Sequence, residues 1–147
     1  MWGAKMQDLE KTFLYKINCQ AAEIADLLNE IFKKIRQEIE ESSEIEFKLE
    51  MAAREILANA IEHGCSLAAE NKEDSDDLRI EVELKLKKES LSFQVRDPGP
   101  GFDWKSYDLT TMPRFEEKGR GLKMINKVAD KMEFNQQGNI ITIYMDF

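Results

Sequence analysis

The sequence predicts an α/β fold: a two-layer α+β sandwich in which a mixed, mostly antiparallel sheet carries helices on one face. Residues 21–39 and 46–63 place apolar side chains at helical spacing. Residues 80–86 and 91–95 alternate apolar and polar side chains, the pattern of half-buried strands. Neither an internal repeat nor a linker is visible, so residues 1–147 are expected to form a single domain of this layered type.

The first strand and the first helix are expected within residues 9–39. Residues 9–17 combine apolar and aromatic side chains with polar ones, which favours a strand. Residues 21–39 are expected to form a helix with one buried stripe, and the polar residues 41–44 separate it from the next helix. The stripe consists of Ile24, Leu27, Leu28, Ile31, Phe32, Ile35 and Ile39.

The second helix is expected over residues 46–63, with a signal at each end. Ser43 is a candidate N-cap, and Glu46, three residues later, would complete a capping box. Gly64 is expected to be the first residue after the helix, because glycine is common at that position. The acidic residues 70–77 carry no apolar anchor and are expected to form an exposed loop.

The two alternating segments are expected to pair as an antiparallel hairpin. Residues 97–101, with the sequence Asp-Pro-Gly-Pro-Gly, should form a rigid turn after it. Residues 103–118 have no clean period and are expected to form a loop. Residues 119–121 then open a third helix, and residues 132–134 and 140–145 form the last strands. The buried face of the third helix is expected to contain Leu122, Ile125, Val128, Ala129 and Met132.

Composition and charge exclude several classes of function. Hydrophobic residues make up 42% and charged residues 34% of the chain, as in soluble globular domains. The 21 Lys+Arg against 29 Asp+Glu give a net charge of -8 without a basic tract, which argues against direct binding of nucleic acid. An acidic chain that binds a nucleotide needs local compensation from a metal ion, helix N-termini or a few cations.

The chain is expected to be cytoplasmic and not inserted in a membrane. Its first residues lack the apolar core of a signal peptide, and no apolar run approaches the roughly 20 residues that span a bilayer. Cys19 and Cys65 lie far apart in the sequence and in no metal-binding spacing. They are therefore expected to be two reduced thiols.

A polar face of the second helix is the first candidate for chemistry. Glu55, Asn59 and Glu62 lie at positions i, i+4 and i+7 and share one side of the helix. This side could be a solvated surface. Alternatively, it could line a pocket in which a carboxylate activates a hydroxyl group and an amide oxygen binds Mg²⁺.

Two glycine-containing segments are the other candidates. Residues 97–101 could be only a turn, or Asp97 could accept a hydrogen bond from an exocyclic amine such as adenine N6. Gly99 and Gly101 would then let the backbone approach the ring. Gly119-Arg120-Gly121 could be only a hinge, or it could bind phosphate at a helix N-terminus. It is not a Walker A loop, which requires Gly-Lys-Ser/Thr.

In their order along the chain, these three groups resemble the signature of the Bergerat-fold ATPases, which include DNA gyrase and the histidine kinases. Residues 55–64 (EILANAIEHG) resemble the N box of that family. Residues 97–102 (DPGPGF) resemble its first glycine box, and residues 119–125 (GRGLKMI) resemble its second. The resemblance covers about residues 9–145 and implies the Bergerat ATP-binding fold, with ATP and Mg²⁺ as ligands.

The resemblance also implies roles for single residues. Asn59 would bind the Mg²⁺ that bridges the ATP phosphates, and Glu55 would be the general base that accepts the proton of a serine or threonine hydroxyl. Asp97 would bind adenine N6, with Gly99 and Gly101 beside the base. The second glycine box adds the ATP-binding residues Gly119, Arg120, Gly121 and Leu122, of which the two glycines give backbone contacts to phosphate.

Some positions depart from the family pattern or are less specific. The family often has Gly-Thr near the last strand, with a hydroxyl that helps to hold the adenine. Here Gly138 is followed by Asn139, and this departure counts against Thr142 as an adenine-site residue. His63 is expected near the helix end, at the pocket rim, and residues 103–118 would be the lid. The candidate phosphate cations are Arg114, Lys118, Arg120 and Lys123.

Within the family, the chain resembles most the anti-sigma-factor serine/threonine kinases. The domain is expected to stand alone, and Glu55 occupies a position where histidine kinases more often have asparagine. This likeness implies phosphorylation of an antagonist protein and sequestration of a sigma factor, and it permits a homodimer. Two alternatives remain: an ATP-binding module that sequesters a partner with little catalysis, and the catalytic domain of a split histidine kinase.

Overall fold

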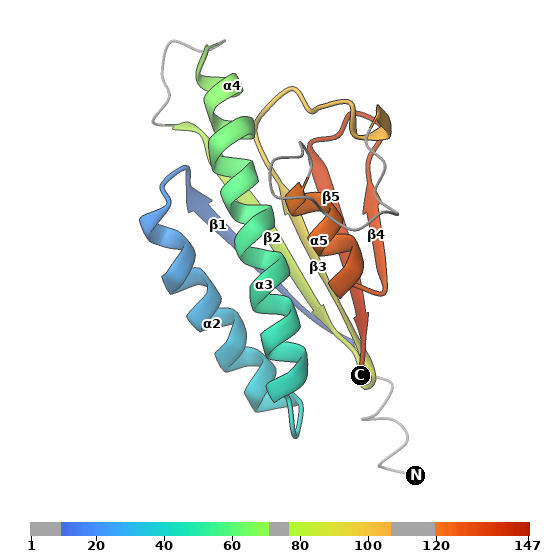
Figure 1. Cartoon of the computed structure of the whole chain (residues 1–147). Coiled ribbons are helices and arrows are strands. Elements are labelled where there is room, and N and C mark those ends of the chain that lie inside the picture. The colour runs from blue at the N-terminus through green and yellow to red at the C-terminus, as the bar shows by residue number, and fades with distance from the viewer. Residues whose placement is uncertain (1–9, 71–76, 107–119) are drawn as a thin grey trace.

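The computed structural model describes residues 10–70, 77–106 and 120–147 (Figure 1). Its strands are β1 (Lys11–Asn18), β2 (Arg79–Leu86), β3 (Ser90–Arg96), β4 (Lys131–Phe134) and β5 (Ile140–Asp146). Its helices are α2 (Ala22–Glu38), α3 (Ser43–Asn59), α4 (Ser66–Glu70) and α5 (Arg120–Val128). A π-helical segment (Ala60–Cys65) joins α3 to α4, and a 3-10 turn (Trp104–Ser106) follows β3. Each of the strands and longer helices that the sequence predicts is therefore present.

The strands form one five-stranded sheet in the order β1-β2-β3-β5-β4. The predicted hairpin is confirmed, with Val82 opposite Val95 and Leu84 opposite Phe93. Pairing of β5 with β3 brings the C-terminal strand into the interior of the sheet. The expectation of a mixed sheet is too broad, because every pairing among the described strands is antiparallel.

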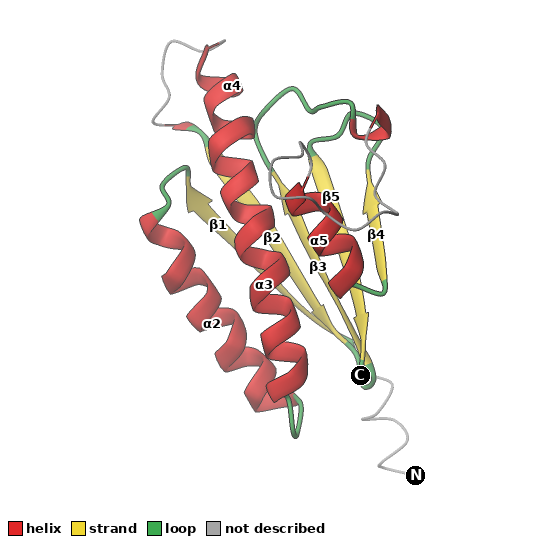
Figure 2. Cartoon of the chain, in the orientation of Figure 1, coloured by secondary structure: helices red, strands yellow, loops and turns green. Residues whose placement is uncertain are grey.

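The helices cover one face of the sheet, and the core lies between these two layers (Figure 2). The alternating apolar residues of the strands point toward the apolar stripes of the helices, which confirms the predicted α+β sandwich. Full burial of one large apolar side chain contributes about 1.5–3 kcal/mol. Side chains at most 1% exposed include Ile31, Ile35, Leu49, Ile80, Leu84, Phe93, Ile125 and Ile143.

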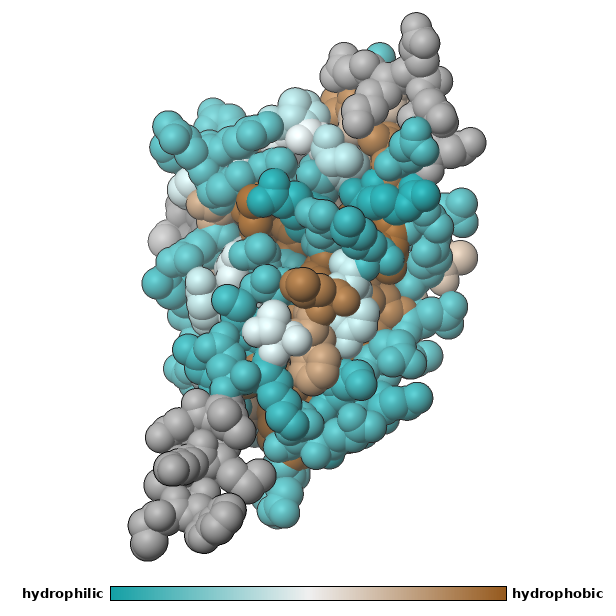
Figure 3. Space-filling view, turned by 180° about the vertical axis from the view of Figure 1, so that it is seen from behind, coloured by the Kyte–Doolittle hydropathy of each residue, from teal (hydrophilic) through white to brown (hydrophobic). Residues whose placement is uncertain are grey.

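The reverse face of the sheet is mostly hydrophilic (Figure 3). On it, Glu81 of β2 lies 3.8 Å from the Lys16 ammonium and 3.5 Å from the Arg96 guanidinium. Charged side chains thus pair with one another on this face, while most apolar side chains of the strands turn toward the helices. Leu14 of β1 is an exception and is exposed. No helix in the part of the chain that the structure describes has the length and apolar character to cross a membrane.

The start of α3 differs from the prediction. The helix begins at Ser43, so that Ser42 and not Ser43 occupies the N-cap position. The Ser42 hydroxyl donates a 2.6 Å hydrogen bond to a Glu46 carboxylate oxygen and does not cap a backbone N–H group. The predicted capping box is therefore wrong. Glu46 instead also forms a 2.7 Å ion pair with Arg36, which ties the start of α3 to the end of α2.

Gly64 does not end the second helix, contrary to the prediction. The π-helical segment and α4 continue the helix as far as Glu70. Gly64 is buried within that segment, and its φ angle is not positive as it would be in a helix-ending glycine. Its missing side chain serves packing, because a Cβ atom at this position would overlap the Asp97 carboxylate.

Cys19 and Cys65 form a disulfide, so the expectation of two reduced thiols is wrong. Cys19 follows β1, and Cys65 is the last residue of the π-helical segment. Their Cα atoms lie 6.1 Å apart although 46 positions separate them in the sequence. The two cysteines are close because the antiparallel path of α2 and α3 returns the chain to the end of β1. Their separation in the sequence gave no sign of this proximity. The bond fastens the segment that contains Gly64 to an edge strand of the sheet.

Replacement of Cys19 with alanine should lower the free energy of unfolding by about 4 kcal/mol, because the disulfide restricts a long loop of the unfolded chain. Urea unfolding of the variant and of the oxidised wild type would measure this. In excess dithiothreitol the wild type should unfold at the same urea concentration as Cys19→Ala. Equal stability of the two proteins without reductant would contradict a stabilising role for the bond.

Candidate functional site

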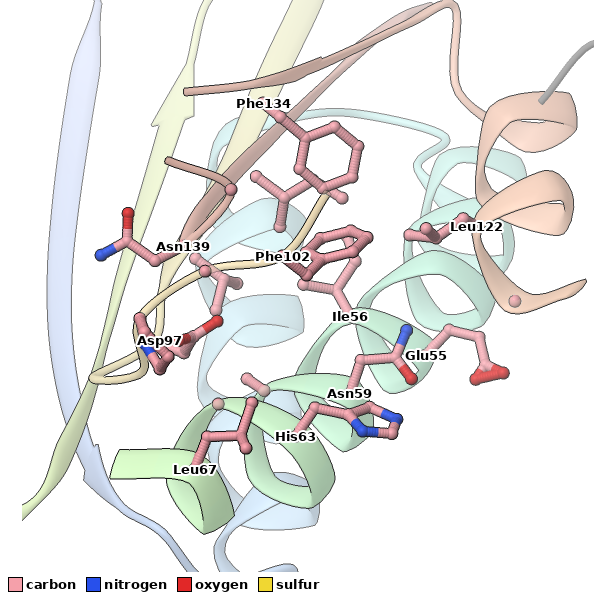
Figure 4. A pocket seen from close by; sticks show the side chains of 18 residues that line it. Glu55, Ile56, Asn59, His63, Leu67, Asp97, Phe102, Leu122, Phe134 and Asn139 are labelled. Carbon is pink, nitrogen blue, oxygen red and sulfur yellow. The ribbon is translucent and has the colours of Figure 1, made fainter. Parts of the chain in front are cut away.

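A cavity of about 310 Å³ opens between the helical layer and the end of the sheet where β3 and β4 finish (Figure 4). Its walls come from α3, the π-helical segment, the turn after β3, the start of α5 and the connection between β4 and β5. Segments distant in the sequence therefore meet at one place. The polar side chains among its described lining residues are Glu55, Asn59, His63, Asp97 and Asn139.

The helical wall presents Glu55, Asn59 and His63, which follow one another at four-residue spacing. The prediction that Glu55 and Asn59 share one side of the helix is confirmed. The prediction for Glu62 is wrong, because its side chain is exposed and does not line the cavity. A π-helix has wider turns than an α-helix, so the residue that follows Asn59 on this wall is His63. His63 thus lies at the cavity rim, but inside a continuous helix and not at its end.

The turn after β3 holds Asp97 at the opposite side of the cavity. The Asp97 backbone N–H group donates to the Asn139 carbonyl oxygen at 3.0 Å. One carboxylate oxygen, Oδ1, accepts the Gly99 N–H group at 2.8 Å. Burial raises the pKa of Asp97 above its ordinary value, and the hydrogen bond from Gly99 partly offsets this. The second carboxylate oxygen receives no hydrogen bond from the described residues.

The two glycines of this turn are required by close backbone contacts. A Cβ atom on Gly99 would lie 2.6 Å from the carbonyl oxygen of Gly64. Gly101 has a φ angle of 90°, which favours glycine, and it lies against the carbonyl group of Gln137. The turn is therefore enclosed by the π-helical segment on one side and by the connection between β4 and β5 on the other.

The start of α5 forms the third wall. Gly121 contacts the side chain of Glu55, since a Cβ atom at position 121 would lie 2.9 Å from Glu55 Oε1. Leu122 lines the cavity with its side chain only 8% exposed. Gly121 is thus brought beside Glu55 of the helical wall, at the same cavity as the turn after β3. The structure does not bring Lys123 to the cavity, because this side chain is buried elsewhere.

Gly119, Arg114 and Lys118 lie outside the described residues, as does the expected lid from residue 107 onward. Arg120 is the first residue of α5. The described start of the lid contains the 3-10 turn Trp104–Ser106.

Sequence reasoning missed an aromatic cluster at the cavity. Phe102 and Phe134 line the cavity, with their rings edge to face at 5.4 Å. Trp104 stacks on Phe134 at 5.2 Å and donates its indole N–H group to the Asn135 carbonyl oxygen at 3.1 Å. Phe102 directly follows the glycine-containing turn, which was a signal in the sequence. Phe134 had no such signal, because its position depends on strand pairing.

Thr142 lies on the reverse face of the sheet, away from the cavity. Its hydroxyl donates a 3.0 Å hydrogen bond to Gln94 on the neighbouring strand. The sequence-based argument against Thr142 is therefore confirmed. Asn139 lines the cavity instead, and its side-chain oxygen accepts a 2.6 Å hydrogen bond from the Asn135 amide.

Comparison with known protein families identifies the class of this domain. The model of the family described as histidine kinase-like ATPase domain matches residues 18–145. Because this match covers most of the chain, the protein belongs to the histidine kinase-like ATPase family. No match was found among curated proteins. ATPase domains of this group bind ATP, typically with Mg²⁺, which agrees with the resemblance recognised in the sequence.

The pH dependence of stability should depend on Asp97. Because burial raises its pKa, the folded protein holds this proton more tightly than the unfolded chain, and wild-type stability should fall as the pH rises through the folded pKa. Asp97→Asn retains an oxygen for Gly99 but has no charge. Urea unfolding between about pH 3.5 and 7 should show Asp97→Asn gaining stability relative to wild type as the pH rises. A stability difference that stays constant over this range, or that changes in the opposite direction, would contradict the burial of an ionised Asp97.

Proposed function

We propose that this ATPase domain is a serine/threonine protein kinase of the anti-sigma type, which phosphorylates an antagonist protein and sequesters a sigma factor. The observation that carries the proposal is the position of Glu55. Its half-buried carboxylate lies on the cavity wall, one helical turn from Asn59 and in contact with Gly121 at the start of α5. A carboxylate in this position can accept the proton of a hydroxyl group presented from outside.

The adenine would bind at the Asp97 end of the cavity. Since Gly99 occupies Asp97 Oδ1, the other oxygen is available to the exocyclic amine of adenine. Phe102 and Phe134 offer aromatic surface beside it. Gly99 and Gly101 would allow the backbone to approach the base.

The phosphates would bind at the other end, between α3 and the start of α5. The N-terminus of α5 provides N–H groups and a favourable dipole, which offset the overall charge of -8. The Asn59 side-chain oxygen would bind Mg²⁺, an ion that usually takes few protein ligands together with phosphate oxygens and water. Bound Mg²⁺ would supply positive charge to the transferring phosphoryl group.

Glu55 would act where the terminal phosphate meets the protein acceptor. Along the helical wall, Gly64 contacts the Asp97 turn and Glu55 lies nine residues earlier, about two helical turns away. The base end and the acceptor end are therefore well separated. In the reaction, the acceptor oxygen bonds to the γ-phosphorus, the bond from that phosphorus to the β-phosphate oxygen breaks, and ADP leaves. Glu55 accepts the hydroxyl proton.

Other functions of the same cavity would give different products. A partner-sequestering module would bind ATP without transferring phosphate. A split histidine kinase would phosphorylate a histidine of another chain, and that bond is acid-labile, whereas phosphoserine is acid-stable. The proposal includes a sigma factor and an antagonist protein as partners, together with a homodimer and a cytoplasmic location. The Cys19–Cys65 disulfide weighs against the last of these, because disulfides are rare in the cytoplasm.

Substitution of Glu55 with glutamine should leave ATP affinity within about threefold of wild type but lower phosphotransfer by roughly 10²–10⁴, because glutamine cannot accept the proton. Glu62→Gln is the matched control, since Glu62 is an exposed carboxylate on the same helix that does not line the cavity. Labelled ATP can be supplied together with candidate antagonist proteins as acceptors. Acid-stable label on serine is the expected result.

Normal transfer by Glu55→Gln would remove Glu55 from the mechanism. Acid-labile label would indicate a histidine acceptor and the split histidine kinase. A stable complex of chain, ATP and acceptor without label would favour the sequestering module. Each outcome therefore separates one of the functions from the others.

A further inference from the structure

We propose that Asn135 is a positioning residue for the nucleotide site. Asn135 follows β4 and does not line the cavity. It holds the connection between β4 and β5 in the shape that fixes Asp97 and the turn after β3. This inference rests on the proposed binding of adenine at Asp97, and it concerns a residue outside the three sequence motifs.

The Asn135 side chain organises the connection between the two strands. Its Oδ1 atom accepts hydrogen bonds from the backbone N–H groups of Gly138, Asn139 and Ile140, at 2.9, 3.0 and 3.0 Å. Its amide nitrogen donates to Asn139 Oδ1 at 2.6 Å. One side chain therefore accepts three successive backbone donors, of which Gly138 also donates to the Asn135 carbonyl oxygen at 3.2 Å.

Asn139 links the Asn135 side chain to Asp97 through hydrogen bonds. Both the backbone N–H group and the side-chain oxygen of Asn139 are bound to Asn135. The carbonyl oxygen of Asn139 in turn accepts the Asp97 N–H group at 3.0 Å. Movement of the connection would therefore move the backbone that orients the Asp97 carboxylate.

The connection between β4 and β5 also contacts the rest of the turn after β3. The carbonyl group of Gln137 lies against Gly101, and its side-chain amide donates to the Pro100 carbonyl oxygen at 3.2 Å. Gly138 lies against the backbone of Phe102. The Asn135 carbonyl oxygen accepts the Trp104 indole N–H group at 3.1 Å, so Asn135 also contacts the segment that follows the turn.

The chemistry of the side chain distinguishes two substitutions. Asn135→Asp keeps an oxygen that can accept the three N–H groups, although it loses the donor to Asn139. Asn135→Leu has a similar size but removes the acceptor of the Asn139 and Ile140 N–H groups, while Gly138 keeps the backbone carbonyl oxygen of residue 135. Unpaired backbone groups favour rearrangement of the turn. A positioning role therefore predicts a large effect of leucine and rescue by aspartate.

The test is calorimetric titration of the folded full-length proteins with MgATP and MgADP, well below their melting temperatures. Asn135→Leu should weaken both nucleotides by the same factor, at least about tenfold, and Asn135→Asp should bind within about threefold of wild type. Inorganic tripolyphosphate, which has no base, should bind all three proteins with the same affinity. The equal loss for ATP and ADP places the defect at the base end.

A destabilised control separates positioning from general loss of stability. Leu86 is 3% exposed and pairs with Leu91 at the far end of β3 from Asp97. Leu86→Ala should lose about 2–5 kcal/mol of stability and keep the wild-type affinity for ATP. Equal affinities of Asn135→Leu and wild type would overturn the proposal, as would equal losses in Asn135→Leu and Leu86→Ala.

Amide hydrogen exchange keeps the proposal testable if Asn135→Leu does not fold. In Asn135→Ala, the Asp97 amide should exchange faster than in wild type, while amides inside β3 keep their protection. Unchanged protection of the Asp97 amide would overturn the proposed link from Asn135 to Asp97 through Asn139. If wild type binds no nucleotide, the proposed function fails as well. If wild type binds ATP and all Asn135 variants bind it equally, only the positioning role fails.

Discussion

The site depends on the approach of two backbones, where Gly64 of the π-helical segment meets Asp97 and Gly99 in the turn after β3. A side chain at either glycine would occupy the space of the opposing segment. This contact joins the helical layer to the end of the sheet, and the cavity opens from it toward α5. The Cys19–Cys65 disulfide lies one residue beyond Gly64, so a covalent bond also restrains the helical side of the contact.

The cavity has two ends with different chemistry. At one end, the Asp97 backbone N–H group binds the Asn139 carbonyl oxygen, and its carboxylate accepts the Gly99 N–H group. Aromatic rings lie nearby. At the other, Glu55 meets the first turn of α5, where a helix N-terminus favours anions. A ligand with an apolar, amine-bearing base and an anionic tail suits both ends. Membership of the histidine kinase-like ATPase family is consistent with this polarity.

Much of the fold could be predicted from the sequence, because amphipathic helices and alternating strands repeat their pattern locally. The site residues Glu55, Asn59, Asp97 and Gly121 could be predicted because they belong to short, ordered motifs. The pairing of Cys19 with Cys65 and the role of Gly64 depend on contacts between distant segments, which no local pattern records. The cavity wall contains His63 and not the predicted Glu62, because the hydrogen bonding of the helix changes in the π-helical segment. Asn135 was missed because its partners become neighbours only when the strand connection folds.

The account depends on binding of an adenine nucleotide in this cavity with its base at Asp97. Amide chemical shifts of the isotope-labelled chain, recorded during titration with MgATP and separately with MgGTP, would report this binding. We expect MgATP to shift the amides of Gly99, Gly101 and Gly121 and to leave those of Lys16 and Lys85, on strands away from the cavity, unchanged. MgGTP, whose base carries a carbonyl group in place of the adenine amine, should shift the Asp97 turn far less. Equal shifts with both nucleotides, or shifts confined to the reverse face of the sheet, would contradict the claim.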